Sequence, residues 1–166
     1  LRVRLVSRPQ PPRRADFRRW HRISLRWSDN DVYGHVNNTV YYSWFDSAVN
    51  SMLVAEGLLD IAGGDPIALV VGTSCDFLAP LSFPGEVEVG LAVTHLGRSS
   101  VRYALGVFAP GNARAAAAGE FTHVAVSRNE RRPVPWPEEW RRVLSTFVVP
   151  AEAGTSAGLA GDPTIT

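Results

Sequence analysis

Residues 37–57 read NNTVYYSWFDSAVNSMLVAEG, and the expected fold follows from this segment. Asn37 and Asn38 are favoured residues at the start of a helix, and Gly57 is typical of a helix end. Between them, apolar residues recur at i, i+4, which is the spacing of one helical face. The two apolar columns are Val40, Trp44, Ala48, Met52 and Tyr41, Phe45, Val49, Leu53. The polar stripe beside them is narrow and nearly uncharged, so most of this helix must be covered by the rest of the chain.

Segments on both sides of this helix alternate apolar and polar residues, which is the pattern of half-buried strands. One such segment precedes the helix at 20–27, and four follow it at 67–78, 86–95, 101–107 and 115–127. A short amphipathic helix is expected at 138–147. The connections between the later strands resemble hairpin turns, which favours antiparallel pairing. The sequence therefore predicts an α+β fold, with an antiparallel five-stranded sheet wrapped around one central helix.

The chain of 166 residues has the size of one domain. Residues 1–16 contain a proline-rich break, and residues 150–166 consist mostly of Ala, Gly, Thr and Pro. Neither segment can bury much apolar surface. We therefore expect a flexible basic arm at 1–16, one folded domain at 17–149 and a flexible tail at 150–166.

Charge and composition limit the partners and the compartment. The net charge of +1 gives no global reason for nucleic-acid binding, although nine of the 17 arginines lie in the first 26 residues. No apolar run approaches the ~20 residues that span a bilayer, so no membrane is expected as a partner. The single Cys75 excludes an intrachain disulfide and suits a reducing compartment, which favours the cytoplasm. An uncovered sheet edge and helix stripe favour a homodimer or a tetramer.

The loop before the helix carries the chemistry. Residues 26–38 read RWSDNDVYGHVNN, which places two carboxylates, a glycine, a histidine and two asparagines directly before a helix N-terminus. Such a terminus offers unpaired amide donors and a partial positive potential that can hold a developing oxyanion. A carboxylate and an oxyanion site are the fewest groups that transfer of an acyl group to water requires. The sequence therefore favours this loop as the candidate site.

This loop resembles the hydroxybenzoyl-CoA thioesterase and acyl-CoA thioesterase family of hotdog proteins. The resemblance rests on DxDxxGHVNN at 29–38 and YxxWFD at 41–46. It extends to FLAPL at 77–81, PGE at 84–86 and GEFTHV at 119–124, and so covers roughly residues 20–147. It implies a hotdog fold and hydrolysis of an acyl thioester, an acyl-CoA or an acyl carrier, without metal or other cofactor.

The resemblance also assigns roles to residues of the loop. Asp31 is the implied catalytic carboxylate, acting either as general base or as nucleophile, and the backbone amide of Asn38 polarises the thioester carbonyl. His35 is the third catalytic candidate, with its role left between orienting the substrate and packing. Expected substrate contacts come from Tyr33, Gly34, Asn37 and Tyr41. Because CoA carries phosphates, cations are expected near the groove mouth, and the candidates at strand ends include Arg98, Arg128 and Arg131.

Other interpretations of the same residues remain open at this point. Asp29 is expected to make structural hydrogen bonds, and Asp46 on the helix is the alternative catalytic carboxylate. A metal cluster of Asp29, Asp31 and His35 is disfavoured because no further ligand recurs at suitable spacing. Cys75 has no base near it in sequence, which disfavours it as a nucleophile. The alternative functions are a hotdog dehydratase and a module that binds acyl thioesters without turnover.

Overall fold

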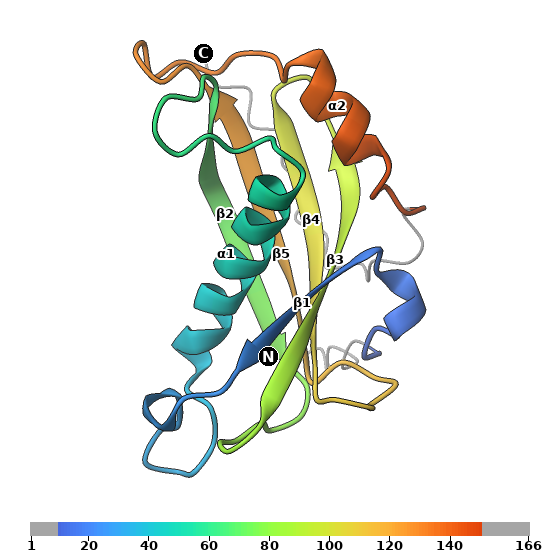
Figure 1. Ribbon diagram of the computed structural model, residues 1–166. Coiled ribbons are helices and arrows are strands. Elements are labelled where there is room, and N and C mark those ends of the chain that lie inside the picture. Colours follow the sequence, from blue (N-terminus) through green and yellow to red (C-terminus); the bar gives the residue numbers. More distant parts are fainter. Residues whose placement is uncertain (1–9, 151–166) are drawn as a thin grey trace, which may run out of the picture.

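A computed structural model describes residues 10–150 of the chain as one five-stranded antiparallel sheet that curls around a long helix (Figure 1). The strands are β1 (Arg19–Ser24), β2 (Ile67–Phe77), β3 (Glu86–Leu96), β4 (Ser100–Phe108) and β5 (Ala117–Val126), and the helices are α1 (Asn38–Ala55) and α2 (Glu138–Ser145). The spatial order of the strands is β1-β3-β4-β5-β2. This is the hotdog fold, as the sequence predicts, and all seven elements lie within a few residues of their expected positions.

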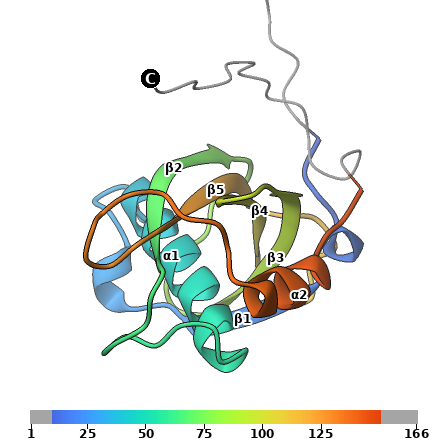
Figure 2. The same ribbon diagram turned by 90° about the horizontal axis from the view of Figure 1, so that it is seen from above.

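Helix α1 is the centre of the fold, as its two apolar columns predict. It begins where the Asn37 side chain accepts a hydrogen bond from the Thr39 backbone amide at 3.0 Å. Phe45, Val49 and Leu53 are completely buried against the inner face of the sheet. Seen along its length, the helix lies inside the curve of the strands (Figure 2). Burial of such a face, and not helix propensity, supplies most of the stability of a helix of this kind.

A glycine on β5 lets the helix approach the sheet closely. A Cβ atom at Gly119 would lie 2.6 Å from a ring carbon of Phe45 and 2.2 Å from the Ser74 carbonyl oxygen. No side chain fits there, so the Phe45 ring packs directly on the backbone of the strand. This contact sets the distance between α1 and the sheet.

The outer face of the sheet is covered in part by the residues before β1. Phe17 is 6% exposed and packs edge-on against Trp20 and Phe108. Its ring lies where Cβ atoms of Gly90 and Gly106 would be, at 2.7 and 2.5 Å. The sequence pattern does not predict this aromatic cover, because Phe108 lies about ninety residues from Phe17 and Trp20.

Two of the expected segments extend beyond the described residues. Residues 1–9 of the expected arm and 151–166 of the expected tail lie outside them. The described part of the arm contacts the sheet, where the Arg14 guanidinium pairs with Glu88 and lies over the rings of Trp20 and Phe108. Within the described residues, no helix is long and apolar enough to cross a membrane.

The strand expected at 20–27 ends early, at Ser24. Trp27 belongs instead to a 3-10 turn, Trp27–Asp29, in which the Asp29 carboxylate accepts a hydrogen bond from the Arg26 amide at 2.7 Å. This side-chain bond takes the backbone out of the strand conformation and starts the loop that leads to α1.

Candidate active site

A pocket of about 320 Å³ opens where α1 begins and β2 ends. Its walls come from the loop, from the first turn of α1 and from the segment that follows β2. The lining residues are Asp31, His35, Val36, Asn38, Tyr41, Phe77, Leu78, Ala79 and Pro80. The structure thus brings all three predicted catalytic residues, and one predicted substrate contact, to a single cavity.

Asp31 is held in this pocket by a local turn. Its Oδ1 atom accepts hydrogen bonds from the backbone amides of Tyr33 at 2.8 Å and His35 at 3.3 Å. Gly34 adopts φ +81°, the left-handed conformation that glycine adopts without strain, and this folds the loop back on itself. No hydrogen bond to Oδ2 occurs within the described residues. One oxygen of the carboxylate therefore fixes its position, and the other stays available.

The N-terminus of α1 supplies a hydrogen-bond donor to the same pocket. The Asn37 side chain caps the Thr39 amide, and the Asn37 carbonyl accepts from the Val40 amide at 3.0 Å. The backbone amide of Asn38, by contrast, has no hydrogen-bond partner in the part of the chain that the structure describes. A free amide at a helix N-terminus is suited to bind a negatively charged oxygen.

The loop is pinned at its base by bonds that do not face the pocket. Asp29 is buried, and its carboxylate pairs with the Arg26 guanidinium at 2.8 Å. Its carbonyl accepts from the Asn37 amide at 2.8 Å, and the Asn30 side chain accepts from the Phe83 amide at 3.0 Å. Asp29 therefore has the structural role that its sequence position favours.

The rest of the pocket wall is aromatic and apolar. Tyr41 packs edge-on against Phe77 with ring centroids 5.1 Å apart. Burial, with a smaller contribution from Cys75, raises the pKa of Tyr41 to about 12, so its hydroxyl stays protonated at neutral pH. Burial also raises the pKa of Cys75 to about 12, followed by the effect of Asp76. A thiol that stays protonated is a poor nucleophile, which agrees with the expectation for Cys75.

The other predicted contacts of the loop have different surroundings. Tyr33 is 82% exposed at the tip of the loop. The Asn37 side chain is occupied by the helix cap, where its Oδ1 accepts from both the amide and the hydroxyl of Thr39. Asp46 does not line the pocket, and its carboxylate accepts from the Asn50 side chain at 3.0 Å.

The three predicted phosphate-binding arginines lie at the opposite end of the sheet within one chain. Strand pairing places Ile67 beside Val126 and Phe77 beside Ala117, so residues that follow β5 are far from the pocket end of β2. Arg128 follows β5, and its Nε atom donates to the Gly64 carbonyl at 2.7 Å. Arg131 follows in the same loop, and Arg98 lies between β3 and β4 at that same end. A single chain therefore does not bring these arginines to the pocket.

Part of the pocket was not predicted as such. Residues 77–80 form one wall, but their sequence shows only a strand end followed by a proline. Their place opposite the loop depends on how β2 packs against α1, which periodicity does not reveal. Within residues 10–150, no group of three or more His, Cys, Asp or Glu is placed to hold a metal ion.

The fold and this pocket define a protein of the hotdog thioesterase class, and comparison with known proteins gives the same result. The chain belongs to the thioesterase-like superfamily, whose family model matches residues 25–144. Membership supports thioester hydrolysis as the general chemistry.

Several known proteins resemble the chain. The PA5185 protein from Pseudomonas aeruginosa strain PAO1 is 50% identical, with 83% of this chain and 96% of that one covered and a TM-score of 0.81. Slr0204, a 1,4-dihydroxy-2-naphthoyl-CoA thioesterase from Synechocystis, is 23% identical over 76% of this chain and 94% of that one, with a TM-score of 0.69. YsmA from Bacillus subtilis is 22% identical over 84% of this chain and 93% of its own length.

Proposed function

We propose that the protein hydrolyses acyl thioesters in the Asp31 pocket, and that acyl-CoA is its substrate class, with acyl carriers as the alternative. The observation that carries the proposal is the meeting of two groups on one cavity. These are the Asp31 carboxylate, with Oδ2 unbonded in the described chain, and the free Asn38 amide at the start of α1.

The two groups supply the parts that thioester hydrolysis needs. Asp31 as general base takes a proton from a water molecule whose oxygen attacks the thioester carbon. The carbonyl oxygen becomes an oxyanion and accepts a hydrogen bond from the Asn38 amide. The C–S bond then breaks, and the thiolate leaves and is protonated. In the nucleophilic variant, Asp31 itself attacks, and water hydrolyses the resulting anhydride.

The aromatic wall favours an apolar acyl group. Tyr41 and Phe77 offer ring surface beside the reacting centre, and the protonated Tyr41 hydroxyl adds a neutral donor. Such a wall provides binding energy without a competing charge near Asp31. His35 also lines the pocket, and we assign it to orienting the thioester.

A homodimer would bring the arginines to the pocket. Strand β2 is the last strand of the sheet, and two copies that pair antiparallel along β2 would set the Phe77 end of one beside the Ile67 end of the other. The loop with Arg128 and Arg131 follows the strand that pairs with Ile67. In this arrangement, cations of one copy lie near the pocket of the second and can bind the phosphates of CoA. Slr0204 is a thioesterase that acts on a CoA thioester, and the similarity to it supports the same substrate class.

Asp31→Asn tests the mechanism. The amide keeps the shape of the carboxylate but cannot accept the proton or attack, so kcat on an acyl-CoA substrate should fall by about 100- to 10,000-fold with a small change in KM. Release of free thiol measures the rate. Asp46→Asn is the matched control, and its kcat should fall by less than about tenfold.

The outcomes of this assay separate the competing functions. An Asp31→Asn protein that keeps most of its kcat contradicts the mechanism, and a dead Asp46→Asn protein moves the catalytic carboxylate to α1. Hydration of enoyl-CoA without thiol release would indicate a dehydratase. Binding of acyl-CoA by the unaltered chain with neither reaction would indicate a module without turnover.

A further inference from the structure

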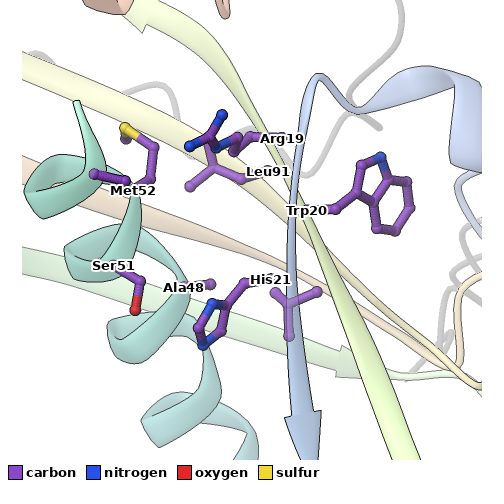
Figure 3. A pocket seen from close by; sticks show the side chains of 9 residues that line it. Arg19, Trp20, His21, Ala48, Ser51, Met52 and Leu91 are labelled. Carbon is purple, nitrogen blue, oxygen red and sulfur yellow. The ribbon is translucent and has the colours of Figure 1, made fainter.

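A second hollow, of about 250 Å³, lies on the other flank of α1, between this helix and β1. Figure 3 shows that Arg19 and His21 point from β1 toward the helix, whereas Trp20 points away from it. The residues that line it from α1 include Ala48, Ser51 and Met52, at the i, i+3, i+4 spacing of one helical face. None of these residues belongs to the Asp31 pocket.

The hollow exists because the strand and the helix both depart from the usual pattern here. Inward-facing positions of a strand normally carry apolar side chains, but β1 places Arg19 and His21 there, with Ile23 following. The facing helix residues Ala48 and Ser51 are small, so they do not fill the space beside the polar side chains. The floor is nevertheless apolar, formed by Met52 with Leu91 of β3.

The polar lining of this hollow favours a negatively charged group. Arg19 contributes a guanidinium, and no Asp or Glu is among the described residues that line the cavity. One Arg19 nitrogen, Nη2, lies 3.3 Å from Glu56, which leaves other N–H donors of the guanidinium. Within the described chain, the His21 ring and the Ser51 hydroxyl make no hydrogen bond, so both can contribute to a ligand.

We propose that this hollow is a second ligand site, which binds small monocarboxylic acids with an apolar body. The carboxylate lies against Arg19 and His21, with the Ser51 hydroxyl beside it, and the apolar body lies on Met52 and Leu91. A guanidinium pairs well with a carboxylate, and the apolar floor selects acids with a hydrocarbon part over small inorganic anions. The acids that thioester hydrolysis releases belong to this class, but the test below does not depend on that activity.

Met52 provides a direct probe of the site, because it is the one methionine of this sequence. The full chain labelled with [methyl-13C]methionine is titrated with hexanoate, and the Met52 methyl resonance is followed by NMR. A spectrum of Met52→Leu separates this resonance from that of an initiator methionine added for expression. We expect a saturable shift with hexanoate, and binding at least about tenfold weaker for hexan-1-ol, which has the same body without the charge.

Substitutions on the two faces of β1 complete the test. Arg19→Gln should weaken hexanoate binding at least about tenfold, whereas Arg22→Gln, on the opposite face of the same strand, should change it less than about twofold. Asp31→Asn should leave the Met52 shift unchanged, which separates this site from the Asp31 pocket. The proposal is wrong if Arg19→Gln binds as the unaltered chain does, or if hexan-1-ol binds equally well. It is also wrong if the Met52 signal does not move up to about 10 mM hexanoate, as when water alone or a second copy fills the hollow.

Discussion

At one edge of the sheet, strand β1 is short and carries arginines; at the other edge, strand β2 is long and apolar. β1 has six residues, and beyond its end the free edge of β3 is taken by the chain after α2. There, the Val93 amide donates to the Phe147 carbonyl at 2.8 Å, and the Val149 amide donates to the Val93 carbonyl at 3.0 Å. β2 has eleven residues and forms the opposite edge of the described sheet.

The side chains of the two edges also favour pairing at β2 over pairing at β1. β1 carries Arg19 and Arg22, and charged residues on an edge strand oppose pairing with another chain. β2 exposes Leu69, Val70 and Val71, by 38%, 46% and 63%. A long apolar edge of this kind is where a second strand adds most readily. The difference explains why we place the interface of the proposed homodimer at β2.

A charge at the centre of the β2 edge should have the largest effect. In a two-fold symmetric dimer, Val71→Arg introduces two charges into one interface, each costing about 2 kcal/mol. We expect the dimer Kd to rise by about 1,000-fold, or about 4 kcal/mol, measured by sedimentation or light scattering. Ser24→Arg on β1 is the control and should leave the Kd unchanged. An unaltered chain that is already an 18.1 kDa monomer at micromolar concentration would remove the interface.

Removal of one aromatic ring near each edge should distinguish an effect on the stability of the single chain from an effect on dimer formation. Phe17, 6% exposed behind β1, fills space between other rings, so Phe17→Ala should lower the free energy of unfolding by about 3–4 kcal/mol. Phe77 on β2 is 42% exposed in the single chain and packs against Tyr41, so Phe77→Ala should cost less than Phe17→Ala, about 1–2 kcal/mol in dilute solution. Urea unfolding at several protein concentrations checks both values. Equal losses at low concentration would contradict the comparison.

The strand that supports β2 also makes the fold sensitive to acid. His123 on β5 is buried, and burial lowers the pKa of its imidazole from 6.5 to about 4. The unfolded chain therefore takes up this proton first, so the contribution of His123 is complete above about pH 6.5 and declines as the pH falls toward 4. The loss amounts to about 3 kcal/mol. Urea unfolding at about pH 7 and pH 4 measures it.

A variant without the imidazole isolates this contribution. His123→Leu should unfold with a smaller difference between the two pH values, whereas His95→Leu, at an exposed position of β3, should keep the full difference. If His123→Leu loses as much stability in acid as the unaltered chain, other groups cause the acid sensitivity.

Substitution of one glycine near each edge should give the smallest difference in stability between the two edges. A Cβ at Gly90 of β3 would lie 2.7 Å from the Phe17 ring, so Gly90→Ala should cost about 1–2 kcal/mol by overpacking. A Cβ at Gly72 of β2 meets nothing within 4 Å, so Gly72→Ala should change monomer stability by less than about 0.5 kcal/mol. Thermal unfolding at low concentration tests the pair, and a large loss for Gly72→Ala would show that β2 is not open.

Most of the architecture was predictable from periodicity. The i, i+4 columns predict α1 within a residue or two, and the alternating segments predict the strands, because local patterns record which face is buried. The cover over the outer face was not predictable, since Phe17 meets Gly90 and Gly106 only after the sheet has formed. The early end of β1 was missed for a related reason, because the Asp29 carboxylate competes with strand pairing for the Arg26 amide.

The candidate site was predictable to a lesser extent. One continuous loop contributes Asp31, His35 and Asn38, so their proximity follows from sequence. The wall at 77–80 and the hollow beside Arg19 depend on contacts between distant elements, and no local pattern records them. The choice of arginines rests on their charge and their places at strand ends, but which end of the sheet they occupy within one chain appears only in the strand register.

The short contact between residues 147–149 and Val93 covers the part of the β3 edge that β1 leaves unpaired. At this edge of the described sheet, the outer side of β1 is the part still unpaired, and its arginines oppose pairing with another chain. Without the segment after α2, the upper part of β3 would become a second acceptor, and each chain could bind one neighbour on either side. Growth would then have no natural stop, and the product would be a filament instead of a closed pair. The backbone bonds of residues 147–149 thus disfavour open-ended assembly through the β3 edge.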